Sequence, residues 1–239
     1  METEALIKKY NIDVKKLEEE QVKLSKLLTI KDSIDFSLAA HIAGIDSVFI
    51  KNQIISSIVV IDENKEVVLQ EYAQQKVRFP YLPGLRAYRE LPAMLEAFKK
   101  LEEKPDVILI QGHGIAHPRL GLASHFSIAA EGIPTIGIAN TLTGAEVQNN
   151  NIIKNEKIVG KVLQTKQGSR PLYMSPGNNI SVEAAEKLVL RYTLLSHKFP
   201  EPLRQAGKFT KKIMKELTGS EESSEKDSQK EKEKEEFLE

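Results

Sequence analysis

The sequence predicts an α/β protein whose mixed β-sheet begins as an antiparallel meander, continues with parallel strands and is flanked by helices. The first observation is a run of three strand-like segments separated by short turns, which is typical of a meander. These segments are residues 42–50, 54–61 and 66–72. The second observation is a strand–helix–strand pattern, because a crossover helix of this kind connects parallel strands. That unit comprises residues 107–111, 124–131 and 135–139.

The composition is that of a globular protein without thiol chemistry. The chain has 239 residues, no cysteine and a formal net charge of zero. It is long enough to bury a sizeable core, and any metal would be held by oxygen or histidine ligands. No apolar run approaches the roughly 18 residues of a membrane span, and the acidic start lacks the apolar segment of a secretory signal. We therefore expect a cytoplasmic protein that does not associate with membranes.

The two ends of the chain differ from its middle. In residues 1–30, apolar side chains recur at helical spacing, which predicts an N-terminal helix packed on the outside of the core. These side chains are Val14, Leu17, Val22, Leu24, Leu27 and Leu28. Residues 219–239 are mostly Glu, Lys and Ser, which predicts a charged disordered tail. Residues 31–218 are the predicted main domain.

The same patterns assign the remaining segments. Residues 79–86 predict a rigid loop with two prolines, and a helix follows over residues 88–101. The polar residues 140–155 predict a mobile loop. The last predicted elements are strands at 158–164 and 171–174, ended by 175–177, and helices at 182–194 and from 201 towards 217.

Three side chains stand out because each has two interpretations. Asp46 lies inside an apolar strand, where a carboxylate must be paired or must bind a metal. Tyr81, held between two prolines, either closes the end of the core or wedges into a base stack. Glu90 lies in the first turn of the predicted helix, where capping and catalysis are both compatible with a carboxylate.

The strand at 107–111 ends abruptly in glycine and histidine. Three of the five histidines of the chain fall between residues 113 and 125. Buried strands in open α/β sheets end at crevices where ligands bind. The residue at the end of this strand, where a carboxylate would serve catalysis, is Gln111.

Together these motifs resemble the endonuclease V family, which has a ribonuclease H-like arrangement of strands and helices. The matching motifs follow the family's order over about residues 40 to 215, and such a series is far more specific than a single motif. They are Ala43–Asp46, Pro80–Gly84, Arg89–Glu90, Gly112–Arg119, Ala123–His125, Pro134–Ala139, Ser175–Gly177 and Pro200–Pro202 with Arg204.

The resemblance implies a magnesium-dependent endonuclease that acts on nucleic acid with deaminated bases, chiefly inosine. Such an enzyme cuts the second phosphodiester bond 3′ to the lesion. Asp46 corresponds to a metal-binding aspartate, Glu90 to the catalytic glutamate and Gln111 to a degenerate metal-binding position. Tyr81 corresponds to the wedge, and the backbone at Gly112 and Gly137 to the wall of a flipped-base pocket. The other nucleic-acid contacts implied are Pro83, Gly84, His117 and Arg119.

Four positions depart from the family's pattern, and the sequence comparison assigns all of them to the neighbourhood of the chemistry. The family carries Asp where this chain has Gln111. It usually carries Lys where this chain has Asn140, and His where this chain has Asn178 and Gly207. Losing one electrostatic partner lowers rates by about 10²–10³-fold in comparable sites. We therefore expect recognition of inosine-type bases with impaired or lost cleavage, weak or absent Mg²⁺ binding and, if the chain is inactive, a protein partner.

Several alternatives stay open at this point. The chain is alternatively an active endonuclease V of DNA repair, or a drifted scaffold without binding. DNA and RNA are not separated, because contacts to the 2′-hydroxyl cannot be read from a sequence. Arg119 fits a phosphate contact or a salt bridge, and Lys208–Lys215 fits a nucleic-acid contact or a solvated helix face. His113, His117 and His125 are not expected to form a zinc site.

Overall fold

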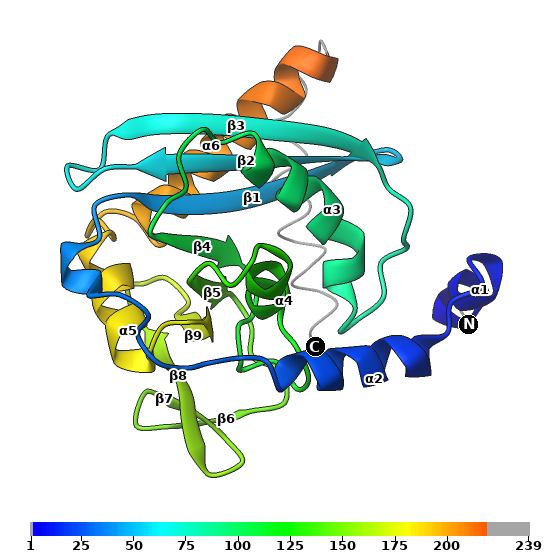
Figure 1. Cartoon of the computed structure of the whole chain (residues 1–239), viewed down its shortest axis with the longest axis horizontal. Coiled ribbons are helices and arrows are strands. Elements are labelled where there is room, and N and C mark those ends of the chain that lie inside the picture. Colours follow the sequence, from blue (N-terminus) through cyan, green and yellow to red (C-terminus); the bar gives the residue numbers. More distant parts are fainter. Residues whose placement is uncertain (1, 219–239) are drawn as a thin grey trace.

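The computed structural model of the chain describes residues 2–218. Met1 and residues 219–239, on which the predicted charged tail falls, lie outside the described residues. The strands form a nine-stranded sheet in the order β3-β2-β1-β4-β5-β9-β8-β7-β6 (Figure 1). Among residues 2–218, no helix combines the length and apolar character that crossing a lipid bilayer requires.

The first three strands form the predicted antiparallel meander. β1 pairs with β2 from Ile42 opposite Ile61 to Ile50 opposite Gln53, and β3 pairs with the other side of β2. The strands are β1 (Ile42–Ile50), β2 (Gln53–Ile61) and β3 (Val67–Lys76). β2 is buried along nearly its whole length, because it lies between two strands and under helices on both faces.

The predicted strand–helix–strand unit is confirmed and continues the sheet in parallel. β4 runs parallel to β1 with Ile110 opposite Ile45, and β5 runs parallel to β4. The elements are β4 (Val107–Gln111), α4 (Leu122–Ala129) and β5 (Thr135–Ala139). The mixed, ribonuclease H-like sheet expected from the sequence is therefore present.

Beyond β5 the sheet continues with antiparallel strands. These are β9 (Leu172–Asn178), β8 (Lys157–Leu163), β7 (Asn151–Lys154) and β6 (Glu146–Gln148). The prediction of a loop throughout residues 140–155 is wrong, because the β6–β7 hairpin lies within it. The prediction that residues 175–177 end a strand is also wrong, since β9 runs through them to pair with β5.

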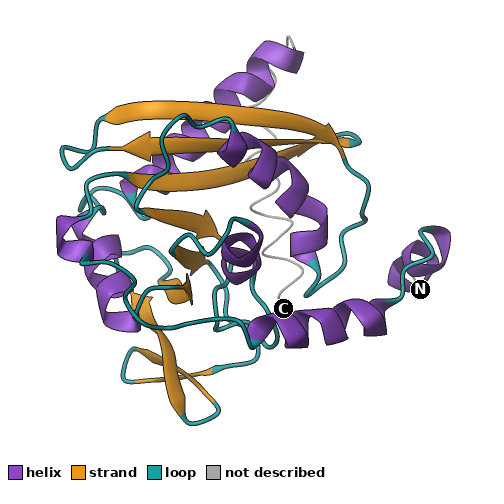
Figure 2. Cartoon of the chain, in the orientation of Figure 1, coloured by secondary structure: helices purple, strands orange, loops and turns teal. Residues whose placement is uncertain are grey.

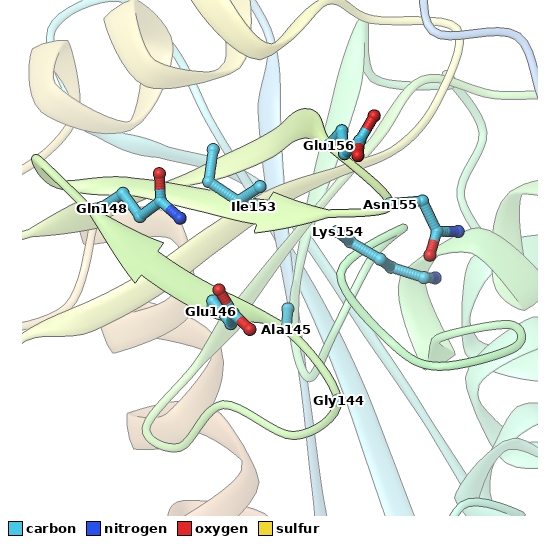
Figure 3. Close-up of a pocket in the computed structure, with 8 residues that line it drawn as sticks. All are labelled: Gly144, Ala145, Glu146, Gln148, Ile153, Lys154, Asn155 and Glu156. Carbon is cyan, nitrogen blue, oxygen red and sulfur yellow. The ribbon is translucent and has the colours of Figure 1, made fainter.

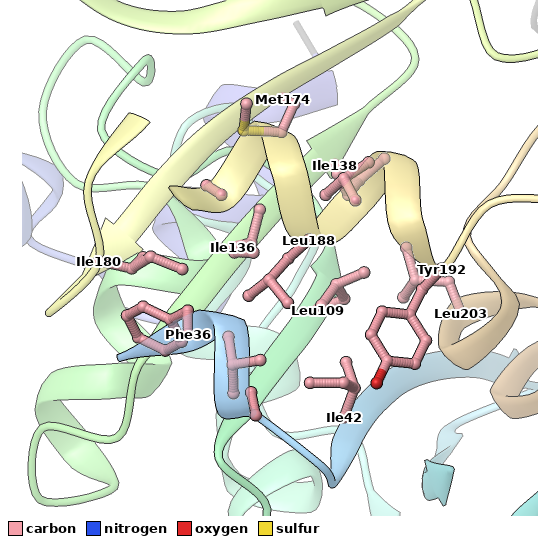
Figure 4. Close-up of a cluster of buried hydrophobic side chains, with 14 of the residues drawn as sticks. Phe36, Ile42, Leu109, Ile136, Ile138, Met174, Ile180, Leu188, Tyr192 and Leu203 are labelled. Atoms are coloured by element: carbon pink, nitrogen blue, oxygen red, sulfur yellow. The ribbon is translucent and has the colours of Figure 1, made fainter. Parts of the chain in front are cut away.

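Helices cover both faces of the sheet (Figure 2). Because side chains alternate along a strand, Ile45 and Ile110 pack towards α3 and α4, whereas Ile42 and Leu109 pack towards α5 and α6. Figure 4 shows the second of these clusters, in which the Tyr192 ring packs among aliphatic side chains. The helices are α3 (Arg86–Lys99), α5 (Val182–Arg191) and α6 (Glu201–Thr218).

The N-terminal segment forms two helices rather than the single one predicted. α1 (Glu2–Lys9) and α2 (Val14–Ser25) are separated by a turn in which Asn11 has a φ of 50°. Asp13 caps α2, since its carboxylate accepts a hydrogen bond from the Lys16 backbone N–H at 3.0 Å. A short 3₁₀ turn at Phe36–Leu38 then leads into β1.

Candidate functional site

Three polar residues lie together where β4 and β5 end. Ile45 is opposite Ile110 in the parallel register, so Asp46 and Gln111 are the next pair along β1 and β4. Alternation of side chains places both on the face covered by α6. Asn140 follows β5 directly and is exposed. We call Asp46, Gln111 and Asn140 the polar edge.

Asp46 carries the most perturbed carboxyl group of the polar edge. Burial raises its pKa from 3.8 to about 6, and the charge of Glu90 acts in the same direction. Hydrogen bonds from Ser47 and Thr210 and the charge of Arg86 oppose this shift. A Cβ placed at Gly207 would lie 3.7 Å from Asp46 Oδ2. Position 207 on α6 therefore adjoins Asp46, and its glycine leaves no side chain there.

Glu90 is buried on α3, and Arg86 neutralises it from one turn earlier. Arg86 Nε lies 2.5 Å from Glu90 Oε1, and Arg86 Nη2 lies 3.0 Å from Glu90 Oε2. The Glu90 residue is 3% exposed, whereas the Arg86 side chain is 41% exposed. Because α3 begins at Arg86 and the Glu90 carboxylate bonds to that guanidinium, the capping interpretation of Glu90 is wrong.

Arg86 also reaches the end of β4. Its Nη1 atom lies 3.5 Å from the position that a Cβ on Gly112 would occupy. Its charge lowers the pKa of Asp46 and contributes to lowering that of His113. One guanidinium therefore faces Glu90, Asp46 and the start of the loop after β4.

The polar edge offers a magnesium ion a single free carboxylate. Mg²⁺ binds through oxygen ligands and usually needs one or two carboxylates. Asp46 supplies one carboxylate and Gln111 a neutral amide oxygen, while both oxygens of Glu90 are bonded to Arg86. Within residues 2–218, no group of three or more His, Asp or Glu side chains is placed to hold a metal ion. A divalent ion at the polar edge would therefore meet one carboxylate and a neutral amide oxygen, with Glu90 already bonded to Arg86.

A lysine reaches the polar edge from a distant part of the sequence. Lys198 Nζ donates a hydrogen bond to Asn140 Oδ1 at 2.9 Å. Lys198 lies between α5 and α6, so sequence comparison at position 140 gives no sign of it. Lys198 thus brings an ammonium group beside position 140, where the resemblance implies a lysine.

Tyr81 stands out from the surface on the loop between β3 and α3. Its residue is 59% exposed, while the flanking Pro80 and Leu82 are buried. The Arg89 guanidinium lies 4.1 Å from the centre of the Phe49 ring and 6.0 Å from that of Tyr81. The core-closing interpretation of Tyr81 is therefore wrong, and its ring is accessible to a ligand together with a cation.

The loop that carries Tyr81 is tied to α2 through Gln21 and Arg119. Gln21 Nε2 donates to the Gly84 carbonyl oxygen at 2.9 Å, and Gln21 Oε1 accepts from Arg119 Nε at 2.8 Å. Arg119 Nη1 also pairs with Glu18 Oε1 at 3.0 Å. The structure therefore places Arg119 in a salt bridge, which is one of the two roles expected for it. Pro83 and Gly84 lie in a loop that Gln21 of α2 holds in place.

Close packing accounts for two glycines near the end of β4. A Cβ on Gly137 would lie 2.3 Å from the Gly114 nitrogen, and one on Gly114 would lie 2.0 Å from the Pro176 carbonyl oxygen. The Gly112 N–H donates to the Ile138 carbonyl at 2.9 Å. Gly137 is thus required for packing the loop against the sheet, and a base-pocket role for Gly112 and Gly137 stays a prediction.

Burial lowers the pKa of His113, His117 and His125 below the ordinary value of 6.5. Burial lowers the pKa of His117 and of His125 to about 4, and neighbouring positive groups lower that of His117 further. The His125 ring packs edge-to-face on Tyr88, with 5.3 Å between ring centres. His113 Nε2 bonds to the Thr141 carbonyl oxygen at 2.8 Å. His113 and His117 therefore lie in the loop after β4, whereas His125 lies on α4 and packs against Tyr88.

Asn178 lies away from the chemistry, contrary to the expectation from the sequence. β9 is antiparallel to β5, so Asn178 lies opposite Thr135 at the start of β5, at the other edge of the sheet. Its Oδ1 accepts from the Thr29 N–H at 2.8 Å, and its Nδ2 donates to Ser127 Oγ at 3.1 Å. Asn178 therefore anchors the segment after α2.

A hollow of about 780 Å³ lies at the β6–β7 hairpin (Figure 3). Lys154 lines it and donates hydrogen bonds to the carbonyl oxygens of Ile115 and His117, which braces the loop after β4. The lining residues are Gly144, Ala145, Glu146, Gln148, Ile153, Lys154, Asn155 and Glu156. None of the predicted site residues lines this hollow, and its two glutamates disfavour a polyanion.

Arg86 is the site residue that the sequence analysis misses. The sequence places it in a loop, because the predicted helix begins only at Tyr88. The available signal is the spacing of Arg86 and Glu90, since residues four apart on a helix are neighbours. That signal becomes visible once the helix is known to begin at Arg86.

Comparisons with known proteins agree with the resemblance. The model of the family described as Endonuclease V matches residues 22–208. The endonuclease V of Thermosipho melanesiensis is 39% identical over 204 residues, covering 81% of this chain and 88% of that protein. The solved endonuclease V of Bacillus subtilis is 26% identical, with a TM-score of 0.78, covering 88% of this chain and 96% of the other.

A third structure shares the fold at lower identity. It is Ciona intestinalis endonuclease V in complex with a 24mer DNA that contains an inosine followed by a ribo-adenosine. The identity is 23% and the TM-score 0.78, and the match covers 85% of this chain and 98% of the other.

Proposed function

This chain belongs to the endonuclease V family, and from that premise we propose that it binds nucleic acid containing inosine-type deaminated bases and cleaves it weakly or not at all. The observation that carries the proposal is a contrast within the molecule. Tyr81 is presented on a braced loop, while the polar edge offers one carboxylate and two amides.

Recognition rests on the groups around Tyr81. An exposed aromatic ring on a rigid loop is able to enter a base stack, and Arg89 beside it provides a cation for stacking or for a phosphate. The base would be read by hydrogen bonds in a pocket near Gly112 and Gly137. The family's inosine substrate, and the inosine-containing DNA bound to the Ciona intestinalis protein, support deaminated bases as the ligand class.

Cleavage is impaired because the chemistry lacks groups that would act on phosphate. The second carboxylate is replaced by Gln111, and position 207 beside Asp46 has no side chain. Each missing electrostatic partner costs about 10²–10³-fold in rate, although such losses are not additive. In this proposal Asp46 and Glu90 remain as an incomplete catalytic pair, and Mg²⁺ binds weakly or not at all.

The alternative is an active magnesium-dependent endonuclease V of DNA repair. One observation favours it: Asp46 and Glu90, the two retained acids, lie close enough for the charge of Glu90 to raise the pKa of Asp46. In that case Gln111 would supply an amide oxygen in place of the second carboxylate.

The test compares binding and cleavage on one oligonucleotide. An inosine-containing strand and its adenosine-containing match are incubated with the protein in Mg²⁺ and in Mn²⁺, and both gel retardation and cleavage are measured. We expect retardation that prefers inosine, without product. Cleavage that disappears in Asp46→Ala would establish the active enzyme instead, and equal retardation of the two strands would contradict inosine recognition.

A further inference from the structure

The Arg86–Glu90 pair is an unusual feature for a site that is expected to attract a divalent cation. Glu90 is buried, and a buried carboxylate must be compensated by a cation or by hydrogen bonds. Arg86 supplies both, because two of its N–H groups bond to the two carboxylate oxygens. The negative charge of Glu90 is therefore already balanced by the protein itself.

The positive charge of Arg86 also acts on the other groups near Glu90. The same guanidinium lies against Gly112 at the end of β4 and acts electrostatically on Asp46. A divalent ion between Asp46 and Glu90 would have to displace Arg86 from Glu90. It would also be repelled by the guanidinium, whose charge is permanent. Arg86 thus competes with a metal for the same acids.

Arg86 retains hydrogen-bonding capacity after it has bound Glu90. A guanidinium has five N–H donors in a planar fork, and Glu90 takes two of them. The side chain is 41% exposed, so a ligand from solvent is able to reach the remaining donors. Arginine is well suited to phosphate, because its charge-assisted hydrogen bonds match the oxygen geometry.

We propose that Arg86 is the resident cation of this site, holding Glu90 and binding a phosphodiester oxygen of the nucleic acid in the place that a divalent metal would otherwise take. This rests on the proposed function, since the ligand is the backbone of the recognised strand. It adds a phosphate-binding residue and gives a reason for metal-independent binding. Arg86 serves here as a binding and positioning residue.

The first experiment measures metal uptake without reference to activity. Mn²⁺ is titrated into the full chain and followed by electron paramagnetic resonance, for wild type, Asp46→Asn, Arg86→Leu and Arg86→Leu/Asp46→Asn. We expect no saturable uptake by wild type, one site in Arg86→Leu and loss of that site in the double variant. A wild-type site that Asp46→Asn removes, or the absence of a site in Arg86→Leu, would overturn the proposal.

The second experiment measures binding to the nucleic-acid backbone. Fluorescence anisotropy follows a labelled inosine-containing oligonucleotide in EDTA, with wild type, Arg86→Lys and the control Arg191→Lys. Arg191 lies at the end of α5 and donates to the Ser37 carbonyl oxygen. We expect about tenfold weaker binding for Arg86→Lys, because one ammonium cannot replace the two-sided fork, and no change for the control.

These measurements separate the two proposals. If wild type binds inosine and adenosine strands equally, the proposed recognition fails, while the Mn²⁺ titration still decides whether Arg86 excludes a metal. If inosine is preferred but Arg86→Lys binds as tightly as wild type, the phosphate role of Arg86 fails alone. Arg86→Lys retains the positive charge beside Glu90. If circular dichroism shows that Arg86→Leu is unfolded, Arg86→Lys still tests the phosphate role in a folded protein.

Discussion

The Tyr81 loop and the polar edge meet at the start of α3, yet they are built in different ways. The loop is held through its backbone: the Leu85 N–H bonds to the Leu82 carbonyl at 3.0 Å, and Gln21, itself bonded to Arg119, holds the Gly84 carbonyl. The polar edge and Glu90 depend on charges that converge from β1 and α3.

In the proposed function, this difference is the reason that recognition is retained while cleavage is impaired. The hydrogen bonds that hold the Tyr81 loop do not involve Asp46, Gln111 or Glu90, so changes at those residues leave these bonds in place. A catalytic site requires several groups at fixed distances, so the loss of one carboxylate at Gln111 affects all of them.

The largest effect is expected from Gln111→Asp. Restoring a carboxylate beside Asp46 should raise cleavage of an inosine oligonucleotide by about 10²-fold or more over wild type, measured in single-turnover assays. The matched control is Gln111→Glu, which adds the charge one methylene further out and should gain less. Unchanged cleavage in Gln111→Asp would show that the missing carboxylate at position 111 is not what limits cleavage. Activity equal to that of an active relative would show that Asn140 and Gly207 are unimportant.

Asp46→Asn should stabilise the fold in a pH-dependent manner. The folded-state pKa of about 6 exceeds the ordinary 3.8, so the folded state binds its proton more tightly than the unfolded state. The contribution of protonated Asp46 to the unfolding free energy is therefore fully present below about pH 4 and is lost as the pH rises through 6. We expect Asn to raise the unfolding free energy by about 2–3 kcal/mol at pH 8 and very little at pH 4. Urea unfolding at both pH values measures this, and an equal gain at both would contradict it.

Tyr81→Ala should weaken the preference for inosine while leaving the fold intact. Loss of one stacked ring corresponds to about tenfold in binding, measured by anisotropy on inosine and adenosine strands. Tyr81→Phe is the control, because it keeps the ring and should keep the preference. An unchanged preference in Tyr81→Ala would remove the wedge role and with it the contrast between the two regions.

The smallest effect is expected from Gln21→Ala, which removes the tether between α2 and the Tyr81 loop. Gln21 is buried and makes two hydrogen bonds, to Gly84 and Arg119, so we expect a loss of about 1–2 kcal/mol in unfolding free energy. Gln164→Ala is the matched control, because that exposed amide also makes two bonds and should change stability by less than about 0.5 kcal/mol. Equal losses of unfolding free energy in both variants would show that the buried tether stabilises the fold no more than an exposed amide does.

Much of the fold follows from periodicity, which the sequence displays directly. Apolar alternation and turn residues predicted the meander β1–β3, the unit β4–α4–β5 and α6. The exceptions are β6 and β7, which have only three and four residues. In β7 the two apolar residues are adjacent, so neither strand shows apolar alternation. The break at Asn11 was likewise hidden, because residues on both sides of it follow a helical pattern.

The family, the proline-flanked aromatic loop and the amide at Gln111 can be read from the sequence, because they are properties of adjacent residues and ordered motifs. Tertiary structure alone decided that Arg86 neutralises Glu90, that Gly207 adjoins Asp46 and that Asn178 lies at the opposite edge of the sheet. The physical reason is that hydrophobic periodicity specifies which face of an element is buried. Which charges meet depends on the exact start of a helix and the direction of a strand, and these are set by packing.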